Sequence, residues 1–184
     1  MLDKKELEII KRKFEKLISE GKIRKPKLGK KEFFKNKAEL SLQLSKDLLK
    51  KEEYLDWVIN TAYYSMFYNA ISLLAKISVD LEDIQESTHV LVYQALIYFF
   101  YIKEKRIETE YLEEFKENME ESNKRLRNVA RQKSEEVISN FKNARKERAK
   151  YTYELGELAK LASAQTAIRR ANAFDIIANK LLLN

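Results

Sequence analysis

The residue types that most often carry catalysis are scarce in this chain of 184 residues, which has one histidine, His89, and no cysteine. A zinc site of the His-Glu-x-x-His type needs two histidines, and thiolate ligands or cysteine nucleophiles need cysteine. Glu86 and His89 have the Glu-x-x-His spacing of di-iron bundles, but such a centre needs a second pair and further inward carboxylates. We therefore expect no metal and no cofactor, and the favoured interpretation of this pair is a polar helix start.

The glycines are also too isolated to build a phosphate-binding loop. They stand at positions 21, 29 and 156, whereas a P-loop or Rossmann motif needs clustered glycines so that backbone N–H groups can approach the phosphate. A serine or threonine nucleophile would need an oriented base, and no recognisable motif surrounds His89. These observations exclude the common nucleotide loops and weigh against catalysis.

Basic residues gather in two segments. Residues 1–37 hold 14 Lys and Arg against 6 Asp and Glu, and the rest of the chain holds 22 against 23. Within the first segment, residues 22–31 (KIRKPKLGKK) have six basic residues and no acid, which predicts a basic linker with Lys22, Arg24, Lys25 and Lys27 as surface candidates. Residues 124–150 hold ten basic residues against three Glu and include Arg127 and Arg131. That segment is either a phosphate-binding strip or a solvated charged helix.

Helices must position these residues, because residues 30–155 contain neither Gly nor Pro, and a sheet protein would need turn residues every ~8–12 positions. Asp3 can cap a helix over residues 3–20, and Gly21 can end it in the left-handed conformation. Further helices are expected over residues 31–51, 57–75 and 87 to about 103–106, and a last one follows Gly156 over residues 158–182. The stretch from residue 109 is either one long helix or two, broken near residues 131–134. The predicted fold is an all-α, up-and-down antiparallel bundle of five or six helices, with a basic N-terminal helix and linker (1–29) preceding the bundle proper (30–184).

Residues 57–75 contain no charge at all, so a membrane span is one alternative. The polar residues Thr61, Ser65, Asn69 and Ser72 recur at helical spacing, which favours a helix surrounded by other helices. Its aromatic residues, Tyr63, Tyr64, Phe67 and Tyr68, could stack on bases, but core packing is the favoured role. Together with the absence of cysteine and of an apolar N-terminal leader, this predicts a cytoplasmic protein.

Two stretches resemble HEPN domains, the helical domains named for proposed nucleotide binding. Residues 62–70 (AYYSMFYNA) resemble the AYYAMFHAA signature of the central helix. Residues 144–151 (ARKERAKY) are similar to the RxxADY element, with Lys150 where Asp is usual. Thr88 and His89 stand where such domains often have a Ser-His or Gly-His pair, and the resemblance covers residues 30–184.

The resemblance implies a HEPN-like bundle that forms homodimers, with Arg145 facing a cleft. Many HEPN proteins are metal-independent RNases with an Arg-x4-6-His motif, which this chain lacks because Tyr151 follows Arg145 where histidine would stand. Others accompany a small nucleotidyltransferase, often as toxin-antitoxin pairs, and are thought to bind nucleotide, RNA or the partner enzyme. The first hypothesis is therefore a non-catalytic binding module for a phosphate-bearing ligand or a nucleotidyltransferase partner, whose cleft is lined by Arg145, Arg148 and Tyr151. The alternatives are a degenerate ribonuclease using Arg145 and Tyr151, and a helical scaffold.

Overall fold

In the computed structural model the chain is all-helical, and the structure describes residues 3–52, 54–84, 86–142 and 153–183. Side chains are described for these residues except 129–160. The helices are α1 (Lys4–Ser19), α2 (Lys30–Lys50), α3 (Leu55–Lys76), α4 (Thr88–Leu96), the π-helix η1 (Ile97–Lys103), α5 (Thr109–Lys142) and α6 (Tyr153–Leu183). No helix of the described part combines the length and apolar character needed to cross a bilayer.

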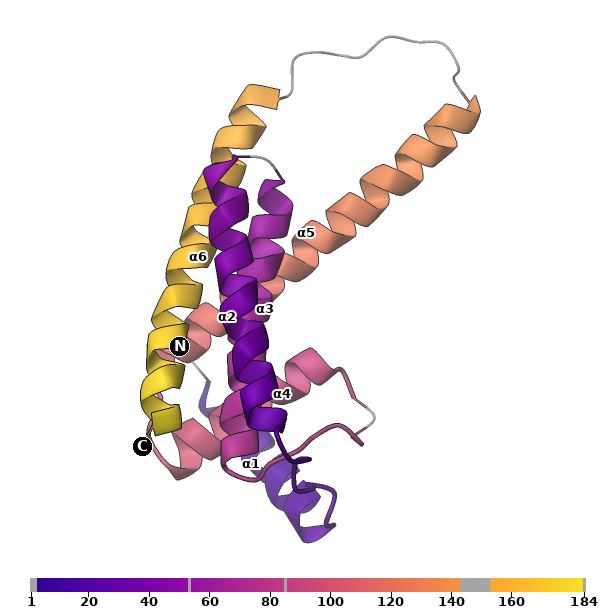
Figure 1. Cartoon of the computed structure of the whole chain (residues 1–184). Coiled ribbons are helices and arrows are strands. Elements are labelled where there is room, and N and C mark those ends of the chain that lie inside the picture. The colour runs from indigo at the N-terminus through magenta and orange to yellow at the C-terminus, as the bar shows by residue number, and fades with distance from the viewer. Residues whose placement is uncertain (1–2, 53, 85, 143–152, 184) are drawn as a thin grey trace.

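Helix α3 lies at the centre of the molecule, with α2 and α6 along its length and α5 crossing it obliquely (Figure 1). Most of its side chains are buried, including Ile59, Tyr63, Met66 and Leu73. This confirms the prediction that the uncharged stretch is an interior helix. An interior position suits this sequence because it has apolar residues on every side of the helix and no charge to keep in water.

Contacts along α3 fix the direction of its neighbours. Helix α2 is antiparallel to it, because Lys31 near the start of α2 meets Ser72 near the end of α3. Helix α5 is also antiparallel, since Ser122 bonds to Asn60. Helix α6 instead runs parallel to α3, with Asp175 beside Asn69 and Leu181 beside Lys76. The bundle thus matches the expected all-helical class, and α3 and α6, which are separated along the chain by α4, η1 and α5, lie parallel.

Helix α1 packs across the end of the bundle against η1. Asp3 accepts a hydrogen bond from the backbone N–H of Lys5, and Gly21 follows the helix at φ +65°, so both predicted ends are confirmed. Phe14 is fully buried and stacks on Tyr98, with ring centroids 5.2 Å apart. The linker after α1 then returns the chain to the start of α2.

Three details differ from the sequence predictions or settle an alternative. Helix α5 is continuous through residues 131–134, which leaves one long helix rather than two. Helix α6 begins at Tyr153 and includes Gly156, so the predicted loop there is wrong. One glycine destabilises a helix by only about 1 kcal/mol, which is small for a helix of 31 residues. The helix expected from residue 87 to about 103–106 is not one α-helix, because α4 ends at Leu96 and the π-helix η1 continues to Lys103.

The four polar residues that recur along α3, Thr61, Ser65, Asn69 and Ser72, form a polar stripe. This stripe sets the register of the neighbouring helices. The Asn69 amide donates to the Asp175 carboxylate of α6 at 3.1 Å, and Lys35 of α2 reaches the same carboxylate at 2.9 Å. Ser72 donates to the backbone carbonyl of Lys31 at 2.9 Å. Ser65 differs, because its buried hydroxyl has no hydrogen-bond partner among the described residues. Buried polar groups with partners stabilise the fold, whereas unpaired ones weaken it.

Asn69 and Ser65 therefore form a matched pair for mutation. Replacing Asn69 by Leu should lower the free energy of unfolding by about 1–3 kcal/mol, because a buried bond to a charged carboxylate is lost. Ser65→Ala should change it by less than about 0.5 kcal/mol or raise it, because no bond is removed. Urea unfolding followed by circular dichroism measures both. An equal loss in the two variants would contradict this assignment of the polar stripe.

Candidate binding pocket and docking face

The predicted ligand cleft cannot be placed on the structure. Arg145, Arg148 and Tyr151 lie outside the described residues, so their roles as phosphate ligands or as ribonuclease residues stay predictions. Arg131 lies within α5, but its side chain belongs to the part that is not described. Arg127 is exposed on α5, beside Lys124 and Glu120.

The basic linker lies against the acidic loop that joins α3 to α4. Backbone hydrogen bonds join Arg24 and Asp80 in both directions, at 3.2 and 2.9 Å, and form an isolated antiparallel bridge. Lys22 pairs with Glu20 at 2.7 Å, and the Arg24 guanidinium pairs with Asp83 at 2.6 Å. Lys25 and Lys27 are exposed. Of the four predicted surface residues, two are thus already neutralised by carboxylates of the chain.

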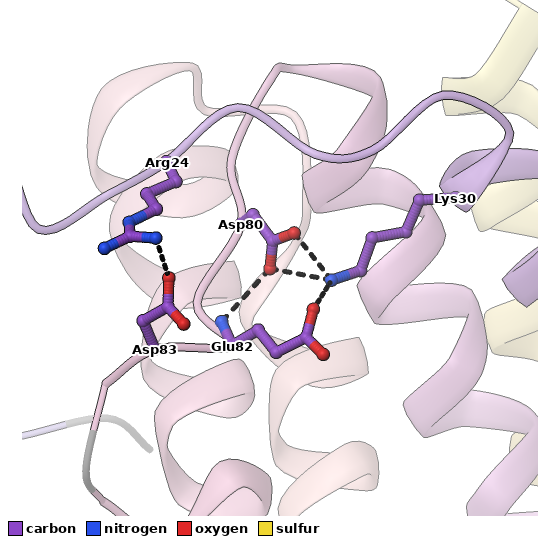
Figure 2. Close-up of polar contacts among 5 residues, drawn as sticks. All are labelled: Arg24, Lys30, Asp80, Glu82 and Asp83. Atoms are coloured by element: carbon purple, nitrogen blue, oxygen red, sulfur yellow. Dashed lines mark hydrogen bonds and ion pairs between the residues drawn. The ribbon is translucent and has the colours of Figure 1, made fainter.

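Lys30 and Asp80 form the central ion pair of this region (Figure 2). The Lys30 ammonium lies 2.7 and 2.6 Å from the two Asp80 oxygens and 3.2 Å from Glu82. The Lys30 and Asp80 side chains are only 15% and 9% exposed, whereas Arg24 and Asp83 in the neighbouring pair are 69% and 53% exposed. A pair shielded from water in this way fixes the start of α2 against the loop before α4.

An apolar pocket of about 650 Å³ opens beside this ion pair. We call it the linker pocket, because Lys27, Leu28 and Gly29 of the linker form one of its edges. Its apolar walls come from α2, α3, the acidic loop and α4 and consist of Phe33, Phe34, Ile71, Leu74, Val79, Leu81 and Val92. The volume lies within the range of about 300–1,000 Å³ that is usual for ligand sites. The pocket therefore has apolar walls, and its charged lining residues are Lys27, Lys30, Asp80 and Glu82.

A line of exposed side chains continues from the pocket along the outer side of α2. Phe33, Leu40 and Leu44 are 55%, 70% and 49% exposed, and spacings of seven and four residues place them on one side of the helix. Lys37 lies between them, with its ammonium 4.9 Å from the centre of the Phe33 ring and 5.2 Å from that of Tyr68. We call these four residues the α2 stripe. Since Ala38, Leu42 and Ser45 are buried on the opposite side, α2 has two apolar sides.

Sequence reasoning missed this stripe, although a signal for it was present. Ala38 and Leu42 stand on one side of the helix expected over residues 31–51, and the structure buries that side. Phe33, Leu40 and Leu44 stand at helical spacing about half a turn away from that side. A helix that has a second apolar side, with a lysine on that side as well, has the pattern expected of a docking surface.

His89, the only histidine, lies at the start of α4 near the pocket and contacts aromatic rings of α3. Its Nδ1 is 2.6 Å from the Tyr63 hydroxyl, and its ring stacks on Phe67 with centroids 4.4 Å apart. Burial raises the pKa of Tyr63, with a smaller contribution from Tyr64, so the phenol stays protonated, and the tautomer of His89 sets which of the two groups donates. Burial also lowers the pKa of His89. This environment agrees with the interpretation of His89 as a polar helix start packed on the core.

The described part of the chain gathers no three His, Cys, Asp or Glu side chains in a geometry that could hold a metal ion. The groups that it brings together are instead the linker pocket, the ion pairs beside it and the α2 stripe.

Lys30→Met tests the buried ion pair. It should lower the free energy of unfolding by about 3 kcal/mol, because the Asp80 carboxylate would stay buried without its cation. Arg24→Met is the matched control and should cost less than about 1 kcal/mol, since that pair is exposed. Urea unfolding measures both, and losses of similar size would show that Lys30 and Asp80 do not fix the linker.

Because the chain has a single histidine, NMR titration of its ring protons measures the pKa of His89 directly. Because its pKa is lowered from the ordinary 6.5, the unfolded chain binds this proton more readily than the folded one. The contribution of His89 to stability is therefore complete above about pH 6.5 and is lost as the pH falls through that value. His89→Gln should remove that part of the acid sensitivity. A titration midpoint at or above 6.5 would contradict the described environment.

Comparison of the chain with protein-family models, with curated proteins and with solved structures finds no match. The HEPN resemblance therefore stays a prediction from the two sequence stretches.

Proposed function

We propose that this chain is a non-catalytic interaction module that binds a partner protein on the linker pocket and the α2 stripe. The observation that carries the proposal is their continuity, because Phe33 both lines the pocket and begins the stripe. Contiguous exposed apolar surface of this kind is typical of protein-interaction sites.

The ion pairs that the basic residues already form favour a protein over a phosphate-bearing ligand at this surface. Lys30 is held by Asp80 and Glu82, Lys35 by Asp175 and Glu39, and Arg24 by Asp83. A phosphate would have to displace these carboxylates before it could be bound. Leu40 and Leu44, the part of the stripe farthest from the pocket, offer no hydrogen bond to a phosphate and no ring on which a base could stack.

This proposal agrees with one branch of the HEPN resemblance, in which a non-nuclease domain accompanies a small nucleotidyltransferase in a toxin-antitoxin pair. A nucleotidyltransferase is accordingly the first partner to test. For the homodimer that the resemblance implies, the α2 stripe is a poor contact, because α2 carries six lysines and three acidic residues and would meet a second copy with the same excess of positive charge.

Site-directed photocrosslinking in the cells that make the protein tests the proposal. A photoreactive phenylalanine analogue at position 40 should crosslink to one partner protein, which mass spectrometry identifies. The same analogue at position 9 is the matched control, because Ile9 is 58% exposed on α1, away from the α2 stripe. Purified partner should then bind the wild-type chain and the Ile9→Glu variant equally and bind Leu40→Glu more weakly. Crosslinking at position 40 that does not exceed that at position 9 would reject the proposed function.

A further inference from the structure

We infer that the element recognised by this surface is an acidic amphipathic helix, which lies along α2 and inserts apolar side chains into the linker pocket. The inference rests on the proposed function and names the chemistry of the partner's contact segment. It follows from the shape of the apolar surface, from the charge around it and from the position of Lys37.

The shape of the surface matches a helix. From Phe33 to Leu44 the stripe spans about 16 Å along the α2 axis, at ~1.5 Å per residue. A partner helix of about three turns covers this length with side chains at every third or fourth position. A peptide that binds by adding a strand would instead need a free sheet edge, and the described residues contain no strand.

The linker pocket gives such a helix its anchor. An apolar cavity of about 150 Å³ can hold a benzene molecule, so a pocket of about 650 Å³ has room for two neighbouring aromatic or aliphatic side chains. Exposed Leu28 and Phe33 stand at its edge and would lose water contact when an anchor enters. Anchors buried in pockets usually carry most of the binding energy of an interface.

The lysines beside the stripe that form no ion pair among the described side chains favour an acidic partner. They include Lys37 of α2 and the exposed Lys25 and Lys27 of the neighbouring linker. Lys37 is the most direct contact, because it lies in the middle of the stripe and its contacts among the described side chains are aromatic rings. A glutamate or aspartate of the partner could pair with this ammonium while the lysine stem stays packed on Phe33. A basic helix or a second copy of α2 would place like charges together there.

Fluorescence anisotropy with the full chain and a designed peptide tests this inference. The probe is a labelled helical peptide of about four turns, with Phe and Leu on one side and Glu elsewhere. Two controls share its apolar residues: one has them in scrambled order, and the other has Lys in place of Glu. The acidic amphipathic peptide should bind at least about tenfold more tightly than either control, and added salt should weaken it.

Variants of the chain then place the binding on the stripe. Leu40→Glu should weaken the acidic peptide about tenfold through burial of a repelling charge, whereas Ile9→Glu, at a similarly exposed apolar residue, should leave it unchanged. Lys37→Glu should weaken the acidic peptide and strengthen the lysine version, an exchange of preference that a merely structural role would not produce. Equal binding of the scrambled peptide, preference for an oligouridine RNA, or self-association of the chain that is lost in Leu40→Glu would each overturn the inference.

The two proposals can fail separately. If a partner crosslinks at position 40 but its crosslinked segment is neither helical nor acidic, the interaction module stands and the acidic helix is rejected. If position 40 crosslinks no more than position 9 and the acidic peptide does not bind, both are rejected.

Discussion

Burial of most of α3 is the constraint on which the rest of this structure depends. Between Asp56 and Lys76 this helix carries no charge, so the chain must surround that stretch, and α2, α5 and α6 do so. Burial also obliges its polar side chains to find partners inside the bundle. Asn60, Asn69 and Ser72 obtain them from α5, α6 and α2 respectively, and these bonds set the register of each neighbouring helix. The polar residues of α3 thus specify how the helices align, while its apolar residues supply most of the driving force.

The linker pocket is a consequence of how the chain enters this bundle. Its floor comes from Ile71 and Leu74 of α3, but its edges come from the linker and from the acidic loop. These two segments are joined by the backbone bridge between Arg24 and Asp80 and by the buried pair of Lys30 with Asp80. Several basic residues of the N-terminal region therefore stabilise the fold, because they pair with carboxylates that hold the linker in place. Lys27 and Lys37, which form no ion pair among the described side chains, lie beside apolar surface.

The sequence predicted the helices well because their signals are local. Asp3 and Gly21 mark the ends of α1, and the absence of charge marks α3 as the interior helix. It could not predict that α6 lies parallel to α3, since that depends on contacts such as Asn69 with Asp175 between residues far apart in the chain. The π-helix η1 was missed for a similar reason, because it allows Tyr98 and Phe99 to pack on Phe14 of α1. The pocket depends on the Lys30 and Asp80 pair, two residues that look like ordinary surface charges in the sequence.

The two apolar sides of α2 explain why a docking surface should lie there and not elsewhere. On the inner side, Ala38 and Leu42 are buried against the bundle, and small residues such as Ala38 and Ser45 let the helix approach closely. On the outer side, Phe33, Leu40 and Leu44 are exposed at the spacing that would bury them if one more helix were added. Leucines that are about half exposed or more contribute less to the stability of the isolated chain than buried ones, because only part of their apolar surface is removed from water. An incoming acidic helix would bury these side chains and neutralise Lys37 together, so the same residues would provide both affinity and the choice of partner.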